Sequence, residues 1–123
     1  MTTIKLLFAM LLAFATFQSA NAQSDKTQRT IGIKSQNIRV SGTCSMDKHR
    51  IETAAYVVDG IKSANWNEYT QILTITYGVF EKDAADNVQK KIAAVGNDTE
   101  KYRANDAVYQ ALPDCCHYQR KQA

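Results

Sequence analysis

The residues of this sequence best suited to chemistry are its cysteines, and Cys44 stands in a turn just before an amphipathic segment. Backbone N–H groups at a helix start, together with the positive end of the helix dipole, stabilise a thiolate. The thiolate is the form of cysteine that binds soft metal ions. The stretch Cys115-Cys116-His117, near the other end of the chain, offers further soft ligands. The chemistry therefore depends on whether these two clusters meet in the fold.

If the C-terminal tail returns to Cys44, two kinds of site are open. Cys44, Cys115 and Cys116 could bind one soft ion as thiolates. Alternatively, Cys44 could form a disulfide with Cys115 or Cys116, which would close a loop of about 70 residues and pin the tail onto the domain. A disulfide between the two adjacent cysteines is disfavoured by the geometry of the bond. The chain has three cysteines, so in an oxidising compartment one thiol must stay free, bind something or pair between chains as a disulfide-linked dimer.

Other side chains near the cysteines are weaker ligand candidates. Met46 carries a soft thioether, although a loop methionine more often packs over the edge of a domain. His117 has an imidazole that suits copper or zinc, but a tail histidine is more often simply exposed. His49 should face solvent or the loop, two residues from the apolar position Ile51. Asp47 is better explained as a residue that favours a helix start than as a metal ligand.

Composition and motifs argue against several other functions. The net charge is only +3, from 15 basic and 12 acidic residues, and no basic stripe with interleaved aromatic residues predicts nucleic-acid binding. The sequence has no glycine-rich phosphate loop and no Cys-x-x-Cys redox motif, and its cysteines lack a histidine and acid at a recognisable catalytic spacing. We therefore expect no enzyme activity.

The N-terminus has the pattern of a secretory signal peptide. Lys5 provides the positive charge, residues 6–17 are almost wholly apolar, and Ala20-Asn21-Ala22 gives a small-x-small cleavage site. The apolar run is shorter than the ~20 residues of a membrane span. The sequence therefore predicts a secreted or periplasmic protein with no membrane span after cleavage. The expected segments are a signal peptide (1–22), a flexible segment (23–34), a single domain (35–104) and a cysteine-containing tail (105–123).

Two helices are indicated by their apolar periodicity. Between residues 48 and 58, apolar side chains recur at helical spacing from Ile51 to Val58, and Asp59-Gly60 follows. Between residues 83 and 95 the stripe consists of Val88, Ile92 and Val95, and Gly96 ends the segment. A further helical turn is predicted at residues 106–112, which Pro113 ends.

Strands are indicated by alternation of apolar and polar residues. The first ends near Ser41, the second covers residues 61–66, the third alternates through Leu73, Ile75 and Tyr77, and a fourth is predicted at residues 99–104. The resulting order predicts an α+β, ferredoxin-like βαββαβ fold. We expect a four-stranded antiparallel sheet with both helices on one face.

From about residue 35 to 104 the chain resembles the heavy-metal-associated (HMA) domain family, the module of copper chaperones, metal-transporting ATPase tails and periplasmic mercury-binding proteins. The resemblance covers about 70 residues and is most specific in the loop around Cys44. The pieces that carry it are Gly42-Thr43-Cys44, Arg50-Ile51-Glu52, Asp59-Gly60-Ile61, Ala64-Asn65-Trp66-Asn67, Thr74-Ile75-Thr76-Tyr77 and residues 92–96.

The chain departs from the family in its ligands. Family members bind soft ions through Cys-x-x-Cys, but Asp47 stands where the second cysteine belongs, and a carboxylate is a poor ligand for copper(I) or mercury(II). Asn97 also stands where the family often has an aromatic residue. The resemblance implies a carrier or sequestering protein for a soft ion, copper(I) first and zinc or mercury(II) next, through Cys44 with Cys115 and Cys116. Its implied partner is a metal-transporting membrane protein or another carrier. The alternative is a disulfide-stapled interaction module of the same fold that no longer binds metal.

Overall fold

The computed structural model describes residues 32–122, so the predicted signal peptide and residues 23–31 lie outside the described part. The sheet consists of β1 (Ile33–Arg39), β2 (Ile61–Asn67) and β3 (Ile72–Gly78). The strand order is β1-β3-β2, with both neighbouring pairs antiparallel. Since β1 begins at Ile33, regular structure starts two residues before the predicted domain boundary.

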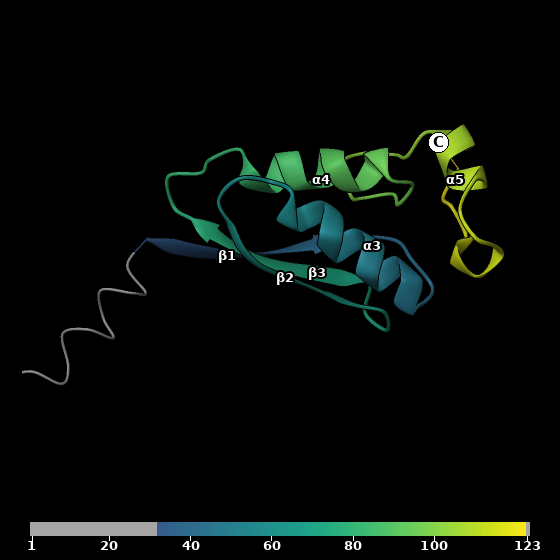
Figure 1. Ribbon diagram of the computed structural model, residues 1–123, viewed down its shortest axis with the longest axis horizontal. Coiled ribbons are helices and arrows are strands. Elements are labelled where there is room, and N and C mark those ends of the chain that lie inside the picture. Colours follow the sequence, from purple (N-terminus) through teal and green to yellow (C-terminus); the bar gives the residue numbers. More distant parts are fainter. Residues whose placement is uncertain (1–31, 123) are drawn as a thin grey trace, which may run out of the picture. The chain divides into compact units, whose positions relative to one another are not determined.

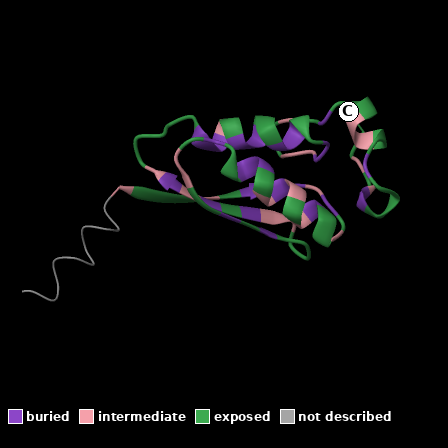
Figure 2. Ribbon diagram, viewed as in Figure 1, coloured by how far each residue is buried: buried purple, intermediate pink, exposed green. Residues whose placement is uncertain are grey.

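Two helices lie on the same side of this sheet (Figure 1): α3 (Ser45–Tyr56) and α4 (Ala84–Ala94). Their buried sides face the strands (Figure 2). The predicted alternation on β3 is confirmed, because Leu73, Ile75 and Tyr77 are all buried, and Trp66 joins them from β2. The core that the helices and strands share consists of Ile38, Val40, Ile51, Ala54, Ala55, Val58, Ala64, Trp66, Leu73, Ile75, Tyr77, Ala84, Ala85, Val88 and Ile92.

The predicted fourth strand does not form in residues 32–122. At that place the structure has an isolated antiparallel bridge between Val40 and Thr99. The reason is a tight turn: the backbone N–H of Thr99 donates to the carbonyl of Tyr102 at 2.8 Å, and the N–H of Tyr102 donates back to Thr99 Oγ1 at 3.0 Å. Asp98 Oδ1 accepts from the N–H of Ala104. These contacts occupy backbone groups that a strand would have paired with β1, so the fold is α+β with a three-stranded sheet.

Val95 is a second difference from the sequence prediction. α4 ends at Ala94, and Val95 is 37% exposed rather than part of the buried stripe with Val88 and Ile92. Gly96 follows with φ of +110°, which turns the chain away from the helix axis. A Cβ atom on Gly96 would lie 2.9 Å from the side chain of Leu112. The turn therefore also provides the space in which the C-terminal tail packs.

The C-terminal tail contains α5 (Asp106–Gln110) and a short 3₁₀ helix, η1 (Asp114–Cys116). After η1 it is fastened to the end of α4. The hydroxyl of Tyr118 donates to the carbonyl of Gly96 at 2.9 Å and accepts from the N–H of Asp98 at 2.8 Å. The Arg120 guanidinium donates to both carboxylate oxygens of Asp98. Among residues 32–122, no helix has the length and apolar composition that a membrane crossing requires.

Candidate metal centre

Cys44 is the N-cap residue of α3, so the helix begins immediately after the thiol and three residues earlier than its apolar stripe indicates. Its backbone is extended, with φ of −148° and ψ of 173°. Burial raises the pKa of the Cys44 thiol, but hydrogen bonds from the backbone N–H groups of Asp47 and Met46 and from Cys116 outweigh it, so the pKa lies below its usual value. These N–H groups belong to the start of α3, where the sequence predicts that a thiolate is favoured.

The tail brings both of its cysteines to Cys44. The Sγ atom of Cys44 lies 3.4 Å from that of Cys116 and 4.0 Å from that of Cys115, and the two tail sulfurs are 3.8 Å apart. All three thiols are free, and they differ in exposure: Cys115 is exposed, Cys44 is half-buried and Cys116 is fully buried. The sulfurs that are distant in the sequence thus form one triangle.

The size of this triangle fits a bound metal ion. The point equidistant from the three sulfurs lies about 2.2 Å from each of them, which is close to the ~2.3 Å of a zinc–thiolate bond. Sulfur ligands select soft ions over hard ones. The three cysteines therefore could hold one ion without a large rearrangement of the chain.

Local structure explains how two adjacent cysteines can point to the same place. Pro113 precedes η1, and its carbonyl accepts from the N–H of Cys116 at 2.8 Å, which closes a tight turn. Across the gap, Thr43 Oγ1 donates to the carbonyl of Cys115 at 2.6 Å. The residue before Cys44 therefore holds the tail in register with the helix start.

Asp47, at the position where the resemblance to the HMA domain would place a second cysteine, is completely buried. Its carboxylate accepts hydrogen bonds from the N–H of Thr43 at 2.8 Å, from Arg50 Nη1 at 2.6 Å and from Asn97 Nδ2 at 2.9 Å. It lies 3.8 Å from Cys44 Sγ. The predicted helix-start role is confirmed, and the buried network around the carboxylate leaves it no evident role as a ligand.

Arg50 and Asn97 also lie at the candidate site, although their sequence pattern does not mark them as site residues. Arg50 Nη2 lies 3.6 Å from Cys116 Sγ while Nη1 pairs with Asp47. Burial raises the pKa of the Cys116 thiol to about 11, against the opposing effect of Arg50. A metal ion must therefore displace a proton from Cys116. The i,i+3 spacing of Asp47 and Arg50 is the sequence signal that could have identified this pair.

The weaker ligand candidates differ in how close they lie to the three sulfurs. Met46 is 48% exposed, and its Sδ lies 3.5 Å from Cys115 Sγ, so its thioether borders the sulfur triangle. His117 does not belong to the group of close ligand atoms. Its ring packs against Tyr109 with centroids 5.0 Å apart, and its Nε2 is buried without a hydrogen-bond partner among the described residues. His49 is exposed on α3, as predicted.

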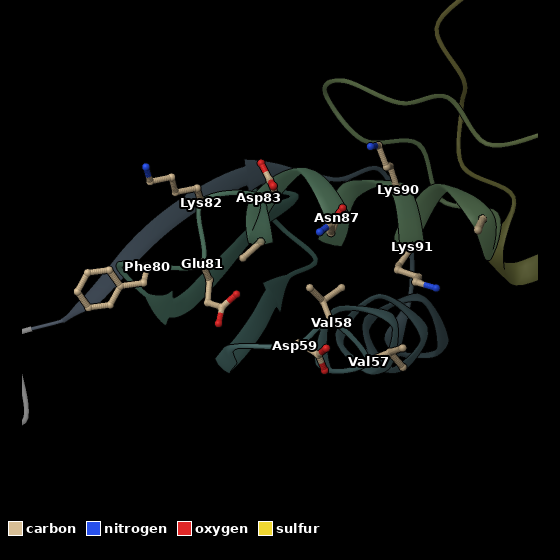
Figure 3. A pocket seen from close by; sticks show the side chains of 12 residues that line it. Val57, Val58, Asp59, Phe80, Glu81, Lys82, Asp83, Asn87, Lys90 and Lys91 are labelled. Atoms are coloured by element: carbon tan, nitrogen blue, oxygen red, sulfur yellow. The ribbon is translucent and has the colours of Figure 1, made fainter.

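A cleft lies at the C-terminal end of α3, whereas Cys44 lies at its N-terminal end (Figure 3). Val57, Val58 and Asp59 line it from the end of α3, and charged side chains face it from α4 and the loop before α4. Its lining contains both acidic and basic groups but no cysteine, histidine or methionine. It therefore offers no soft ligands, and the sulfur triangle is the better candidate for metal chemistry.

Comparison with known proteins gives solved structures that are similar to about half of this chain. No known protein family and no curated relative matches the chain. The structure named "CopZ metallochaperone" is 25% identical and has a TM-score of 0.50; the match covers 54% of this chain and 98% of that one. The soluble region of the P-type ATPase CopA from Bacillus subtilis is 29% identical, with 55% and 44% coverage and a TM-score of 0.49. The ZiaAN sub mutant is also 29% identical, with 55% and 94% coverage and a TM-score of 0.46. The likeness to CopZ is consistent with the ferredoxin-like HMA fold that the sequence resembles.

Proposed function

We propose that this protein binds one soft metal ion, copper(I) foremost, through Cys44, Cys115 and Cys116, and carries or sequesters it outside the cytoplasm. The observation that carries the proposal is the sulfur triangle, whose centre lies about 2.2 Å from each sulfur. The likeness to the CopZ metallochaperone supports the proposal, because a similar fold serves metal handling in that protein. In this chain the thiols of that fold come from Cys44 and the C-terminal tail. The tail provides the ligands that Asp47 does not.

The N-terminal pattern of the sequence supports a location in the periplasm or outside the cell. A carrier in that location would exchange its ion with a metal-transporting membrane protein or with another carrier. Exchange requires a ligand that a partner can reach, and Cys115 is exposed while Cys116 is not. Met46 borders Cys115 on the same exposed side. These two sulfur groups are therefore our candidates for the first and last contacts of the ion.

The proposal is tested by titrating the fully reduced protein with copper(I) in the presence of a competing chromogenic chelator. We expect one tightly bound ion per chain, and a large loss of affinity in Cys44→Ser. His49→Ala is the matched control, because His49 is exposed on the same helix and contacts none of the three sulfurs in the described structure. Unchanged binding by Cys44→Ser would remove the central ligand from the proposal.

One contact favours a second candidate function, a disulfide-stapled interaction module. The Sγ atoms of Cys44 and Cys116 are only 3.4 Å apart, so oxidation could join them and leave Cys115 free for pairing with another chain. Alkylation of native protein followed by intact mass measurement separates the two functions. Three alkylated thiols in protein isolated without reductant exclude the disulfide-stapled form, whereas a single alkylated thiol supports it.

A further inference from the structure

Three thiolates around one ion form an anionic complex, of charge −2 with a monovalent ion and −1 with a divalent one. Cys116 is fully buried, so the negative charge of its thiolate would have no contact with solvent. Burying charge is costly unless an opposite charge and hydrogen bonds compensate for it. The site therefore needs a compensating group on the buried side of the triangle.

Arg50 is the cation at that position. Its side chain is 19% exposed, and Nη2 lies 3.6 Å from Cys116 Sγ. The neighbouring cation, Lys48, is engaged elsewhere, with Glu52 and the carbonyl of Trp66. The N-terminus of α3 adds its dipole, but on the side of Cys44.

The guanidinium is held in this position by a chain of buried polar contacts. Asn97 Nδ2 donates to Asp47 Oδ1, and the same oxygen accepts from Arg50 Nη1 at 2.6 Å. The planar fork of arginine lets one nitrogen bind the carboxylate while the other reaches the sulfur. An arginine side chain is not deprotonated in proteins, so Arg50 stays charged beside the thiol.

We propose that Arg50 is the positioning residue that keeps Cys116 in the metal complex, and that Asp47 orients Arg50 for this purpose. This inference rests on the proposed function. On this account, the residue that replaced the second loop cysteine does not bind the ion. It instead fixes the cation that allows a buried thiolate from the tail to take over as ligand. Without Arg50 the ion would keep Cys44 and the exposed Cys115 and would lose Cys116.

The test measures the number of sulfur ligands by X-ray absorption of the copper(I)-loaded protein, together with affinity from chelator competition. We expect three sulfur neighbours in the wild type and two in Arg50→Met. We also expect affinity to fall about tenfold or more, because a charge-assisted hydrogen bond to a buried group is lost. Arg50→Lys, which keeps the positive charge, should recover part of the affinity. Lys91→Met removes one positive charge from the exposed side of α4 and serves as the control.

Removal of Arg50 alone leaves the Asp47 carboxylate buried without its cation, so that variant could unfold. The double variant Asp47→Asn with Arg50→Met removes both charges and keeps an amide beside Asn97. We expect it to fold and to show the same change from three sulfur neighbours to two. Three sulfur neighbours and wild-type affinity in the folded double variant would overturn this inference while leaving the proposed function intact. A wild-type protein that binds no copper(I) would overturn both.

Discussion

The Sγ atoms of Cys44 and Cys116 lie 3.4 Å apart, although the residues are separated by 72 positions in the sequence. The contact joins the N-cap of α3 to the 3₁₀ turn in the tail. Two further contacts hold the tail in this position: Thr43 Oγ1 donates to the carbonyl of Cys115, and the hydroxyl of Tyr118 donates to the carbonyl of Gly96. The site is thus a product of tertiary structure and not of a local motif.

The two tail cysteines should contribute unequally to affinity. We expect Cys116→Ser to weaken copper(I) binding about tenfold more than Cys115→Ser, a difference of ~1.4 kcal/mol. Cys116 is buried against Arg50, whereas water or the Met46 thioether can approach the place of Cys115. Chelator competition on both variants checks the order, with Ser45→Ala as the control. Equal losses would show that burial does not distinguish the two ligands.

The hydroxyl of Tyr118 should stabilise the closed tail. Tyr118→Phe removes the buried bond to the carbonyl of Gly96 and the partly buried bond from the N–H of Asp98, and leaves both groups without this partner. We expect a loss of about 1–3 kcal/mol in the free energy of unfolding, measured by denaturant titration. Tyr69→Phe is the control, because Tyr69 is 89% exposed. The account is contradicted if Tyr118→Phe is as stable as the control.

Acid should weaken the attachment of the tail through Asp98. Burial raises the pKa of this carboxyl, but hydrogen bonds from Arg120 and from the N–H of Ala104 outweigh it and hold the pKa below the unfolded value of 3.8. The folded state therefore binds fewer protons, so the stabilisation is complete above pH 3.8 and disappears as pH falls through the folded-state pKa.

The measurement is the free energy of unfolding between neutral pH and about pH 2. In Asp98→Asn the acid-dependent loss should be smaller than in the wild type, since asparagine does not titrate. Asp59→Asn, at an exposed position, should keep the wild-type slope. An Asp98→Asn curve parallel to that of the wild type would rule out this carboxyl as the source of the acid sensitivity.

Metal loading should stabilise the fold, because the three sulfurs come together only in the folded state. At a free ion concentration of about 100 times Kd, linkage predicts ~2.7 kcal/mol of added stability, which raises Tm by roughly 10 °C or more for a domain of this size. Thermal unfolding of the reduced protein with and without copper(I) measures the shift. Cys44→Ser should show little of it, and an equal shift in that variant would place the ion elsewhere.

Most of the sheet and both main helices could be predicted from local patterns. Ile51 and Ala55 repeat at helical spacing, and Leu73 and Ile75 alternate, because each pattern reports one buried face. The fourth strand could not be excluded in this way, because the hydrogen bonds between Thr99 and Tyr102 that replace it depend on the exact path of the turn.

The candidate site was predictable only in its parts. Cys44 could be recognised from its place before a helix, and Cys115 and Cys116 from their chemistry. The return of the tail depends on contacts of Tyr118 and Arg120 with residues about 20 positions away, and no periodic pattern records these. The link from Asp47 through Arg50 to Cys116 likewise appears only once the tail has closed.

The central claim is that one ion is bound by three sulfurs, two of which come from the tail. X-ray absorption of the reduced, copper(I)-loaded wild-type protein tests it most directly. The account predicts three sulfur neighbours at about 2.2–2.3 Å, the distance that the sulfur triangle already allows. Copper that remains bound with two or fewer sulfur neighbours, or protein that emerges from gel filtration without copper, would contradict the account.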